Sequence, residues 1–348
     1  MTSKKHYGKQ TGRPITHELP TPAGGVRLET FVPWTLVRRG LKKRVITPLD
    51  APQEFLAEAK QERAAQAAAQ DSALMRALGL AHHWQRLLDE DRSTSVAAIA
   101  KAELDRSGER LAIVSRSGLA LQRLDQRYSH AGISLKTSDN TPWSVRQLYY
   151  ACDAQRPRLF DQGMSGFVMG ANDPDEGYLS IVLLPAKAAD AIERAARDDA
   201  QSLALLGDTY SANAYAFSTR YQNCNQWLAE LLASAWAPAA GESRAGAQQW
   251  LRDAGYAPTV LQVGWQPLIW LAGQIRWLHT DDHPADDLAA ARFRVSMPAS
   301  IEGFVRQQHP EARRIELCYS PTHVVVRHGW TAIAAGCQPA PGDAVVAL

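Results

Sequence analysis

The sequence predicts an α+β domain that runs from residue 107 to the C-terminus, behind a basic and partly helical N-terminal extension. After Ser107, short runs with strand-like alternation are interleaved with amphipathic helical runs. Before it, the chain is first rich in Pro, Gly and basic residues and then rich in Ala. With 348 residues, 45% apolar and 21% charged, the chain is long enough for a sizeable core and has an ordinary globular composition.

The first segment, residues 1–52, is expected to be a basic arm that is largely disordered, in which only 28–39 (LETFVPWTLVRR) alternates like a strand. Residues 1–48 contain ten Lys or Arg against two Glu, a net charge of +8. Because the whole chain carries +2, the remainder carries −6. A basic arm on an acidic body is typical of weak contact with nucleic acid or another polyanion, and equally of a solvated tail.

The second segment, residues 53–106, reads as helical. Its apolar residues recur at helical spacing in LMRALGLAHHWQRLLDE, and TSVAAIAKAEL follows with Ser95 as a candidate cap. We therefore place the boundary of the main domain at 106/107.

The main domain, residues 107–348, is expected to contain several strands and helices. The predicted strands are 110–116, 129–136, 143–150, 178–185, 313–319 and 323–328. The predicted helices are one long helix at 186–206, one that starts near Asn223, and others at 245–254, 267–278 and 300–308.

The helix near Asn223 carries the first candidate functional residue. In RYQNCNQWLAELL, Asn223 is a good N-cap, which places Cys224 in the first helical turn. The unpaired backbone N–H groups there favour a thiolate over a thiol. A small inert residue is also common at this position, so Cys224 alone does not establish a nucleophile.

A nucleophilic cysteine needs a base and a group that orients the base. His130 lies at the start of a predicted strand, beside Ala131 and Gly132, whose small size is expected to leave room near the imidazole. Gln147, on the next predicted strand, is the candidate orienting group if the two strands form a hairpin. Each residue also has an ordinary structural interpretation, as a histidine at a strand edge and a polar strand residue.

The composition predicts neither a cofactor nor a metal. The four cysteines form no CxxC pair, so a structural zinc site is not expected. No apolar run is long enough to span a membrane, and the N-terminus has no apolar signal-like stretch, so we expect a cytoplasmic protein.

Four segments resemble a bacterial family of unknown function, the domain numbered 2145: RYSHAGISL, PWSVRQLYYACD, STRYQNCNQWLAELLASA and VSMPASIEGFVRQQHP. The resemblance extends from about residue 109 to 346. Relatives of this domain often carry a secretory signal. The resemblance therefore implies a secreted location, whereas the N-terminus of this sequence predicts a cytoplasmic one.

More distantly, SHAG on a strand and, much later, NC at a helix start resemble the circularly permuted papain-like hydrolases, including NlpC-type peptidases. This resemblance implies an antiparallel sheet packed on helices, with Cys224 as nucleophile, His130 as base and Gln147 at the third position. Permuted relatives act on amide or ester bonds as hydrolases or acyltransferases. Whether Cys152 pairs with Cys337 is left open, because spacing does not decide it.

Residues 29–48 and 78–103 resemble the front of small phage- or recombination-associated proteins that carry a helix-turn-helix. The chain enters a strand where the recognition helix would follow, so the DNA-reading half is missing. Three functions therefore remain: a cysteine-dependent hydrolase or acyltransferase, a catalytically silent module that binds a peptide, glycan or lipid, and non-specific DNA contact through the basic arm.

Overall fold

The protein is described here from a computed structural model of the whole chain. The structure describes residues 92–348, except 119–120, 153, 171–175, 240–241 and 264–276, together with six short strands before residue 44. The chain divides into two units, Met1–His82 and His83–Leu348.

The described strands of the first unit form three antiparallel pairs. β2 (Ile15–Pro20) pairs with β3 (Val26–Phe31), and two shorter pairs accompany them. The shorter pairs are β1 (Lys9–Gln10) with β4 (Trp34–Thr35), and β5 (Arg38–Arg39) with β6 (Lys42–Lys43). The helical segment expected at 53–91 and the side chains of the basic arm lie outside the described residues, so nucleic-acid contact stays a prediction.

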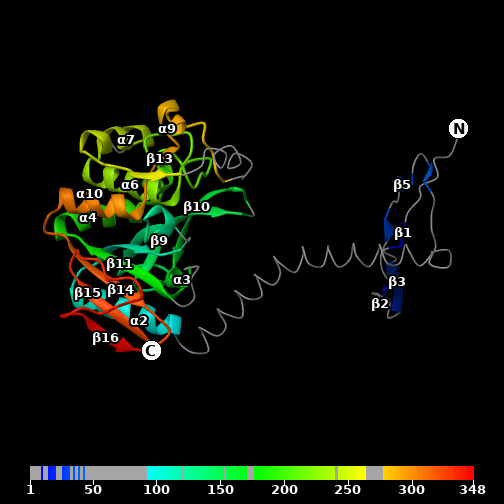
Figure 1. Cartoon of the computed structure of the whole chain (residues 1–348), viewed down its shortest axis with the longest axis horizontal. Coiled ribbons are helices and arrows are strands. Elements are labelled where there is room, and N and C mark those ends of the chain that lie inside the picture. The colour runs from blue at the N-terminus through cyan, green and yellow to red at the C-terminus, as the bar shows by residue number, and fades with distance from the viewer. Residues whose placement is uncertain are drawn as a thin grey trace. The chain divides into compact units, whose positions relative to one another are not determined.

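An eight-stranded antiparallel sheet organises the second unit (Figure 1). The strand order is β10-β9-β8-β7-β11-β14-β15-β16. The strands are β7 (Leu111–Arg116), β8 (His130–Leu135), β9 (Ser144–Ala151), β10 (Arg156–Gln162), β11 (Gly177–Leu183), β14 (Arg313–Tyr319), β15 (His323–His328) and β16 (Ala344–Ala347). Each predicted strand of the main domain is present, whereas β10 and β16 were not predicted.

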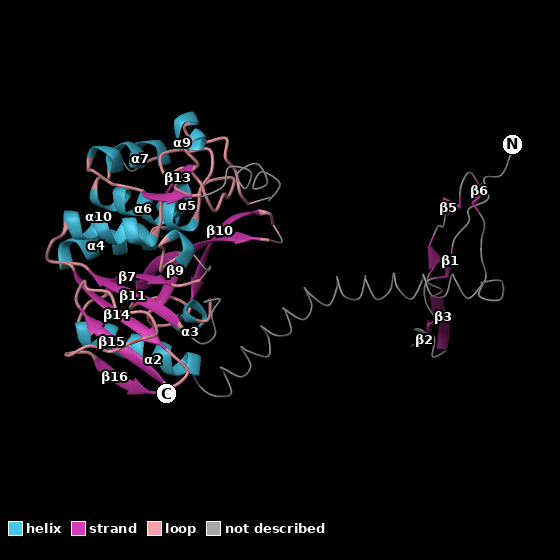
Figure 2. Cartoon of the chain, in the orientation of Figure 1, coloured by secondary structure: helices cyan, strands magenta, loops and turns pink. Residues whose placement is uncertain are grey.

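Helices cover both faces of the sheet (Figure 2). One face packs against α4 (Ala186–Arg197), α6 (Cys224–Trp236), α7 (Arg244–Asp253) and α10 (Pro298–Gln308). The other face packs against α2 (Arg92–Ser107) and α3 (Met164–Val168). In β7, Leu111 and Ile113 belong to the first core while Ala112 and Val114 belong to the second, because side chains alternate between faces. The central strands are therefore apolar on both sides.

Helix α2 belongs to this unit although its residues were assigned to the N-terminal extension. Val96, Ala97, Ala100 and Leu104 are buried against the sheet. Their spacing places them on one helical face. The segment that resembles the start of a helix-turn-helix thus covers a sheet, and the compact unit includes the helix before residue 107.

The predicted long helix at 186–206 is two helices, α4 and α5 (Asp199–Ala204). The Asp198 side chain accepts a hydrogen bond from the backbone N–H of Gln201 at 3.0 Å, so it caps α5. A carboxylate at this position ends one helix and starts the next. The predicted helix at 267–278 falls almost entirely outside the described residues.

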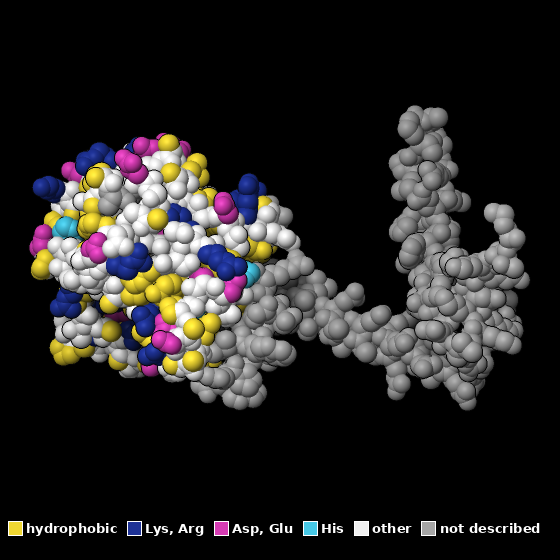
Figure 3. Space-filling model, turned by 90° about the horizontal axis from the view of Figure 1, so that it is seen from above, with side chains coloured by type: hydrophobic (Ala, Val, Ile, Leu, Met, Phe, Trp, Pro, Cys, Tyr) yellow, Lys and Arg dark blue, Asp and Glu magenta, His cyan; other side chains and the backbone are white. Residues whose placement is uncertain are grey.

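A smaller antiparallel pair, β12 (Thr259–Gln262) with β13 (Arg292–Val295), follows α7, and α9 (Ala285–Ala289) precedes β13. On the face of this unit seen in Figure 3, basic and acidic side chains are interspersed. Among the described residues, no helix is long and apolar enough to cross a membrane.

Candidate active site

Helix α6 begins at Cys224, as its capping sequence predicts. The side chain of Asn223 accepts a hydrogen bond from the backbone N–H of Gln226 at 2.7 Å. Its amide nitrogen donates to the carbonyl oxygens of Ala212 and Ser296, both at 3.3 Å, which fixes the cap against two loops. Cys224 is therefore the first helical residue, and its side chain is only 8% exposed.

A hydrogen bond connects the start of α6 to the start of β8. The Asn225 side-chain amide donates to the carbonyl oxygen of Ser129 at 3.1 Å. Asn225 follows Cys224, and Ser129 precedes His130. Because α6 also packs against β8 and β9, residues 94 positions apart in the sequence are brought to one place.

His130 and Gln147 are in direct contact, as the predicted hairpin requires. The Nε2 atom of His130 lies 2.8 Å from Oε1 of Gln147, and both side chains are buried. The Gln147 amide nitrogen donates to Oε1 of Gln162 at 2.9 Å. Since Gln162 takes the amide hydrogen, the oxygen of Gln147 faces the imidazole and accepts its Nε2–H. The Nδ1 atom of His130 then carries the basic lone pair.

Gln162 was not predicted from the sequence. It ends β10, whose sequence RPRLFDQ lacks an alternating apolar pattern and contains Pro157. Proline is tolerated here because β10 is the edge strand of the sheet. Gln162 could have been predicted to contact Gln147 only if the pairing of β10 with β9, which aligns Gln162 with Val145, had been known.

Burial keeps both Cys224 and His130 neutral at rest. Burial raises the pKa of the Cys224 thiol to about 11, although the backbone N–H of Asn225 and the charge of Arg116 lower it. Burial, followed by Arg116, lowers the pKa of His130 to about 3, although the hydrogen bond with Gln147 raises it. The helix start was expected to favour a thiolate; here the loss of hydration is the larger effect.

Three further residues surround the pair. Tyr149 stacks on the His130 ring, with centroids 4.5 Å apart and an interplanar angle of 16°. Arg116, which pairs with His130 across β7 and β8, donates to the Tyr149 hydroxyl at 2.6 Å. The Tyr210 hydroxyl is near the Cys224 thiol and lowers the pKa of that thiol. Arg116 and Tyr149 lie on predicted strands, but none of the three residues was predicted to belong to the site.

The small residues beside His130 have a different role from the one expected. A Cβ atom on Gly132 would lie 2.6 Å from Cγ1 of Val145 and 3.1 Å from Cβ of Gln147. Gly132 therefore lets β9 approach β8 closely, and the space beside it is filled by protein. This close approach is what places Gln147 within reach of the imidazole.

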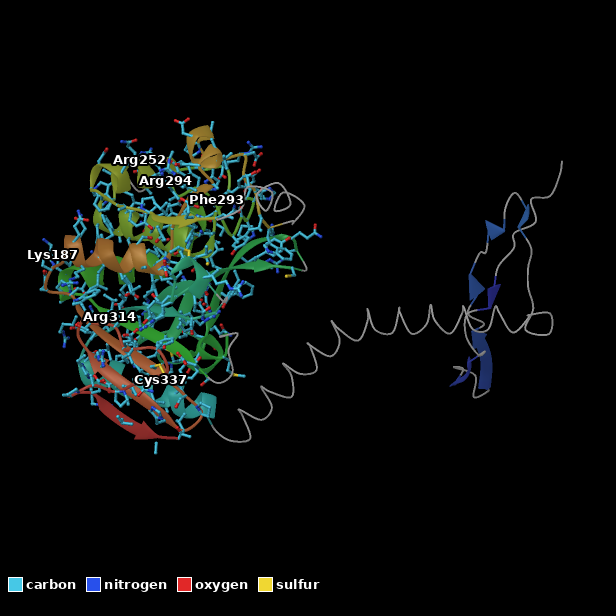
Figure 4. The ribbon with its side chains drawn as sticks, in the orientation of Figure 1. Lys187, Arg252, Phe293, Arg294, Arg314 and Cys337 are labelled. Atoms are coloured by element: carbon cyan, nitrogen blue, oxygen red, sulfur yellow. A yellow bond between two sulfur atoms is a disulfide. The ribbon has the colours of Figure 1, made fainter. Side chains whose placement is uncertain are left out.

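The structure contains a disulfide that does not involve Cys152. Cys318 of β14 forms a disulfide with Cys337, which is labelled in Figure 4, and both are buried. Cys152 is free and exposed, so it does not pair with Cys337. Within the described part of the chain, no group of three His, Cys, Asp or Glu side chains is arranged to hold a metal ion.

Comparison with known proteins identifies the family. Residues 103–305 match the model of a family described as uncharacterized protein conserved in bacteria (DUF2145). This match covers more than half of the chain, so the chain belongs to that family. No curated protein and no solved structure matches the chain.

Proposed function

We propose, from membership of this uncharacterised family and from the geometry of the site, that the protein is a cysteine-dependent hydrolase or acyltransferase of amide or ester bonds. Cys224 is the nucleophile, His130 the general base and Gln147 the residue that orients the base. The hydrogen bond from His130 Nε2 to the Gln147 amide carries the proposal, because it leaves Nδ1 as the basic nitrogen. The strand that bears this base is hydrogen-bonded to the helix that begins at Cys224.

The fold that we propose is the circularly permuted papain-like fold. Its support is the order of the parts: a histidine at the start of a central antiparallel strand, followed in sequence by a cysteine at the start of a helix packed on that sheet. In papain-like enzymes of ordinary order the cysteine comes first.

In the proposed reaction, the thiol of Cys224 transfers its proton to Nδ1 of His130 as the sulfur attacks the substrate carbonyl carbon. The carbonyl π electrons move to the oxygen, and the backbone N–H at the start of α6 stabilises the oxyanion. When the tetrahedral intermediate collapses, the imidazolium gives its proton to the leaving amine or alcohol. Water or a second nucleophile then attacks the acyl carbon while His130 accepts its proton, the carbon–sulfur bond breaks, and the imidazolium returns the proton to the Cys224 sulfur.

The neutral resting pair favours a mechanism in which proton transfer accompanies attack. A thiol of raised pKa and an imidazole of lowered pKa do not form an ion pair without substrate. The same observation favours the second candidate, a catalytically silent module that uses this region to bind a peptide, glycan or lipid. The two candidates differ in whether Cys224 ever forms a covalent bond to an acyl group.

Acyl probes distinguish the two candidates. The purified chain is incubated with amide, thioester and lipid-ester probes, and acylated peptides are identified by mass spectrometry. We expect the label on Cys224, its loss in Cys224→Ala and at least a tenfold slower reaction in His130→Ala, with Cys152→Ala as the matched control. Labelling of Cys224 that is indifferent to His130, or no labelling in a folded protein, would favour the binding module.

The disulfide bears on where the domain works. Disulfides persist in oxidising compartments and are rare in the cytoplasm of most cells. The Cys318–Cys337 bond therefore favours an oxidising compartment over the cytoplasmic location that the sequence suggested.

A further inference from the structure

Arg116 is a buried cation for which the described residues supply no carboxylate partner. Its side chain ends β7 and is 6% exposed. The guanidinium donates to the carbonyl oxygens of Ser117 and Gly170 and to the Tyr149 hydroxyl, all of which are uncharged. Its Nε atom is buried and has no acceptor in the described structure. A buried arginine usually has an acidic partner. Arg314, which is buried to a similar degree, is paired with Glu316.

The protein holds this guanidinium in a slot formed by two glycines. A Cβ atom on Gly118 would lie 2.7 Å from Nη1, and one on Gly170 would overlap the guanidinium carbon. The ring of Phe167 lies 5.5 Å from the same carbon. Side chains at either glycine position would displace Arg116, so its place beside His130 is built into the backbone.

Among the described residues, no carboxylate compensates the positive charge of Arg116 at the candidate site. Cys224 and His130 are both neutral at rest, while Arg116 lowers the pKa of each of them, and so acts on both. A buried charge without a counter-ion costs several kcal/mol, and this cost is recovered when an anion enters. The site therefore has a positive charge in place before any substrate binds.

We propose that Arg116 makes this site selective for acyl donors that carry a carboxylate next to the reacting carbonyl. The inference rests on the proposed function, which supplies the nucleophile, and adds the substrate class. The carboxylate would compensate the guanidinium and place the carbonyl carbon between Cys224 and His130. Arg116 is in this sense a specificity residue, and the nucleophile and base act on whichever acyl group it selects.

Two alkylating reagents of nearly the same shape test the charge selectivity. Iodoacetate carries a carboxylate where iodoacetamide carries a neutral amide; in both, sulfur forms a bond to the CH₂ carbon, iodide leaves, and the thiol proton passes to base. The rate of each reagent is measured at Cys224 and, in the same molecule, at the exposed Cys152. The quantity compared is the ratio of the iodoacetate rate to the iodoacetamide rate.

We expect this ratio to be at least about tenfold higher at Cys224 than at Cys152, because a hydrogen bond between two charged groups is stronger than one to a neutral amide. Arg116→Gln should bring the ratio at Cys224 down to that at Cys152, and Arg116→Lys should keep part of the preference. Equal ratios in the wild-type protein overturn the inference. So does a Gln variant that slows both reagents equally, because Arg116 would then serve only the thiolate.

A second measurement needs neither a variant nor a reactive thiol. Acetate and acetamide are titrated into ¹⁵N-labelled protein while the Nε–H resonance of Arg116 is followed by NMR. Acetate should shift this resonance with saturation, and acetamide should not; no shift with acetate overturns the inference. Failure of the proposed function looks different, because acetate would still bind Arg116 while no acyl probe labelled Cys224.

Discussion

The neutral state of Cys224 predicts an unusual pH dependence for its alkylation. With a pKa of about 11, about three thiols in ten thousand are ionised at pH 7.5. An unperturbed thiol with a pKa of about 8.5 is about one-tenth ionised at the same pH. Since the thiolate is the nucleophile, Cys224 should react about 300-fold more slowly than a simple exposed thiol near neutral pH. The helix start alone would favour the opposite order.

The assay is the rate of iodoacetamide modification at Cys224, followed by mass spectrometry from about pH 6 to 10.5, with exposed Cys152 as the internal reference. The Cys224 rate should rise through pH 10 without reaching a plateau. His130→Ala should change it little near neutral pH, because a neutral imidazole supplies no charge. A plateau below pH 8 that disappears in His130→Ala would refute the reasoning, since it would show a thiolate–imidazolium pair at rest.

Three other predictions follow from the same structure. The pKa of His130 falls from 6.5 to about 3 on folding, so as the pH drops the unfolded chain takes up a proton on this histidine before the folded chain does. The free energy of unfolding should therefore be unaffected by this group above pH 6.5 and should fall by up to about 5 kcal/mol as the pH drops to 3. Urea titrations should show a shallower fall for His130→Gln. Gln147→Glu should raise the pKa of His130, read from its ring protons by NMR, because a carboxylate favours the imidazolium; no rise would mean that Gln147 does not face the ring. Replacing both Cys318 and Cys337 by Ala should cost about 3 kcal/mol of stability, from the loop that their separation of 19 residues closes, whereas Cys152→Ala should cost little; equal losses would contradict this account.

The neighbourhood of the site could be predicted from the sequence only in part. Asn223 and Cys224 were found because a helix cap is local: the residue types and the spacing of the apolar face are all within one segment. His130 and Gln147 were found as a strand start and a polar residue on the next strand, which depended on a short hairpin. Gln162, Tyr149 and Tyr210 gave no comparable signal, because their relation to the site arises from strand register and loop packing.

The membership of α2 shows the same distinction. Its sequence predicts a helix, and its apolar stripe predicts that one face is buried. Which surface covers that face is a non-local question that the helical pattern does not answer. The buried Val96, Ala100 and Leu104 pack instead against strands that come later in the chain.

The sequence by itself determined the local elements: the central strands, the cap before Cys224, the candidate base and its amide partner, and the family to which residues 103–305 belong. Only the tertiary structure decided that Cys318 rather than Cys152 pairs with Cys337, that Gly132 serves strand approach, and that no carboxylate of the described residues compensates Arg116 beside the site. The physical reason is that caps and periodicities depend on residues a few positions apart. Charge compensation and hydration depend on what the fold excludes from water, and this is set by contacts between residues far apart in the chain.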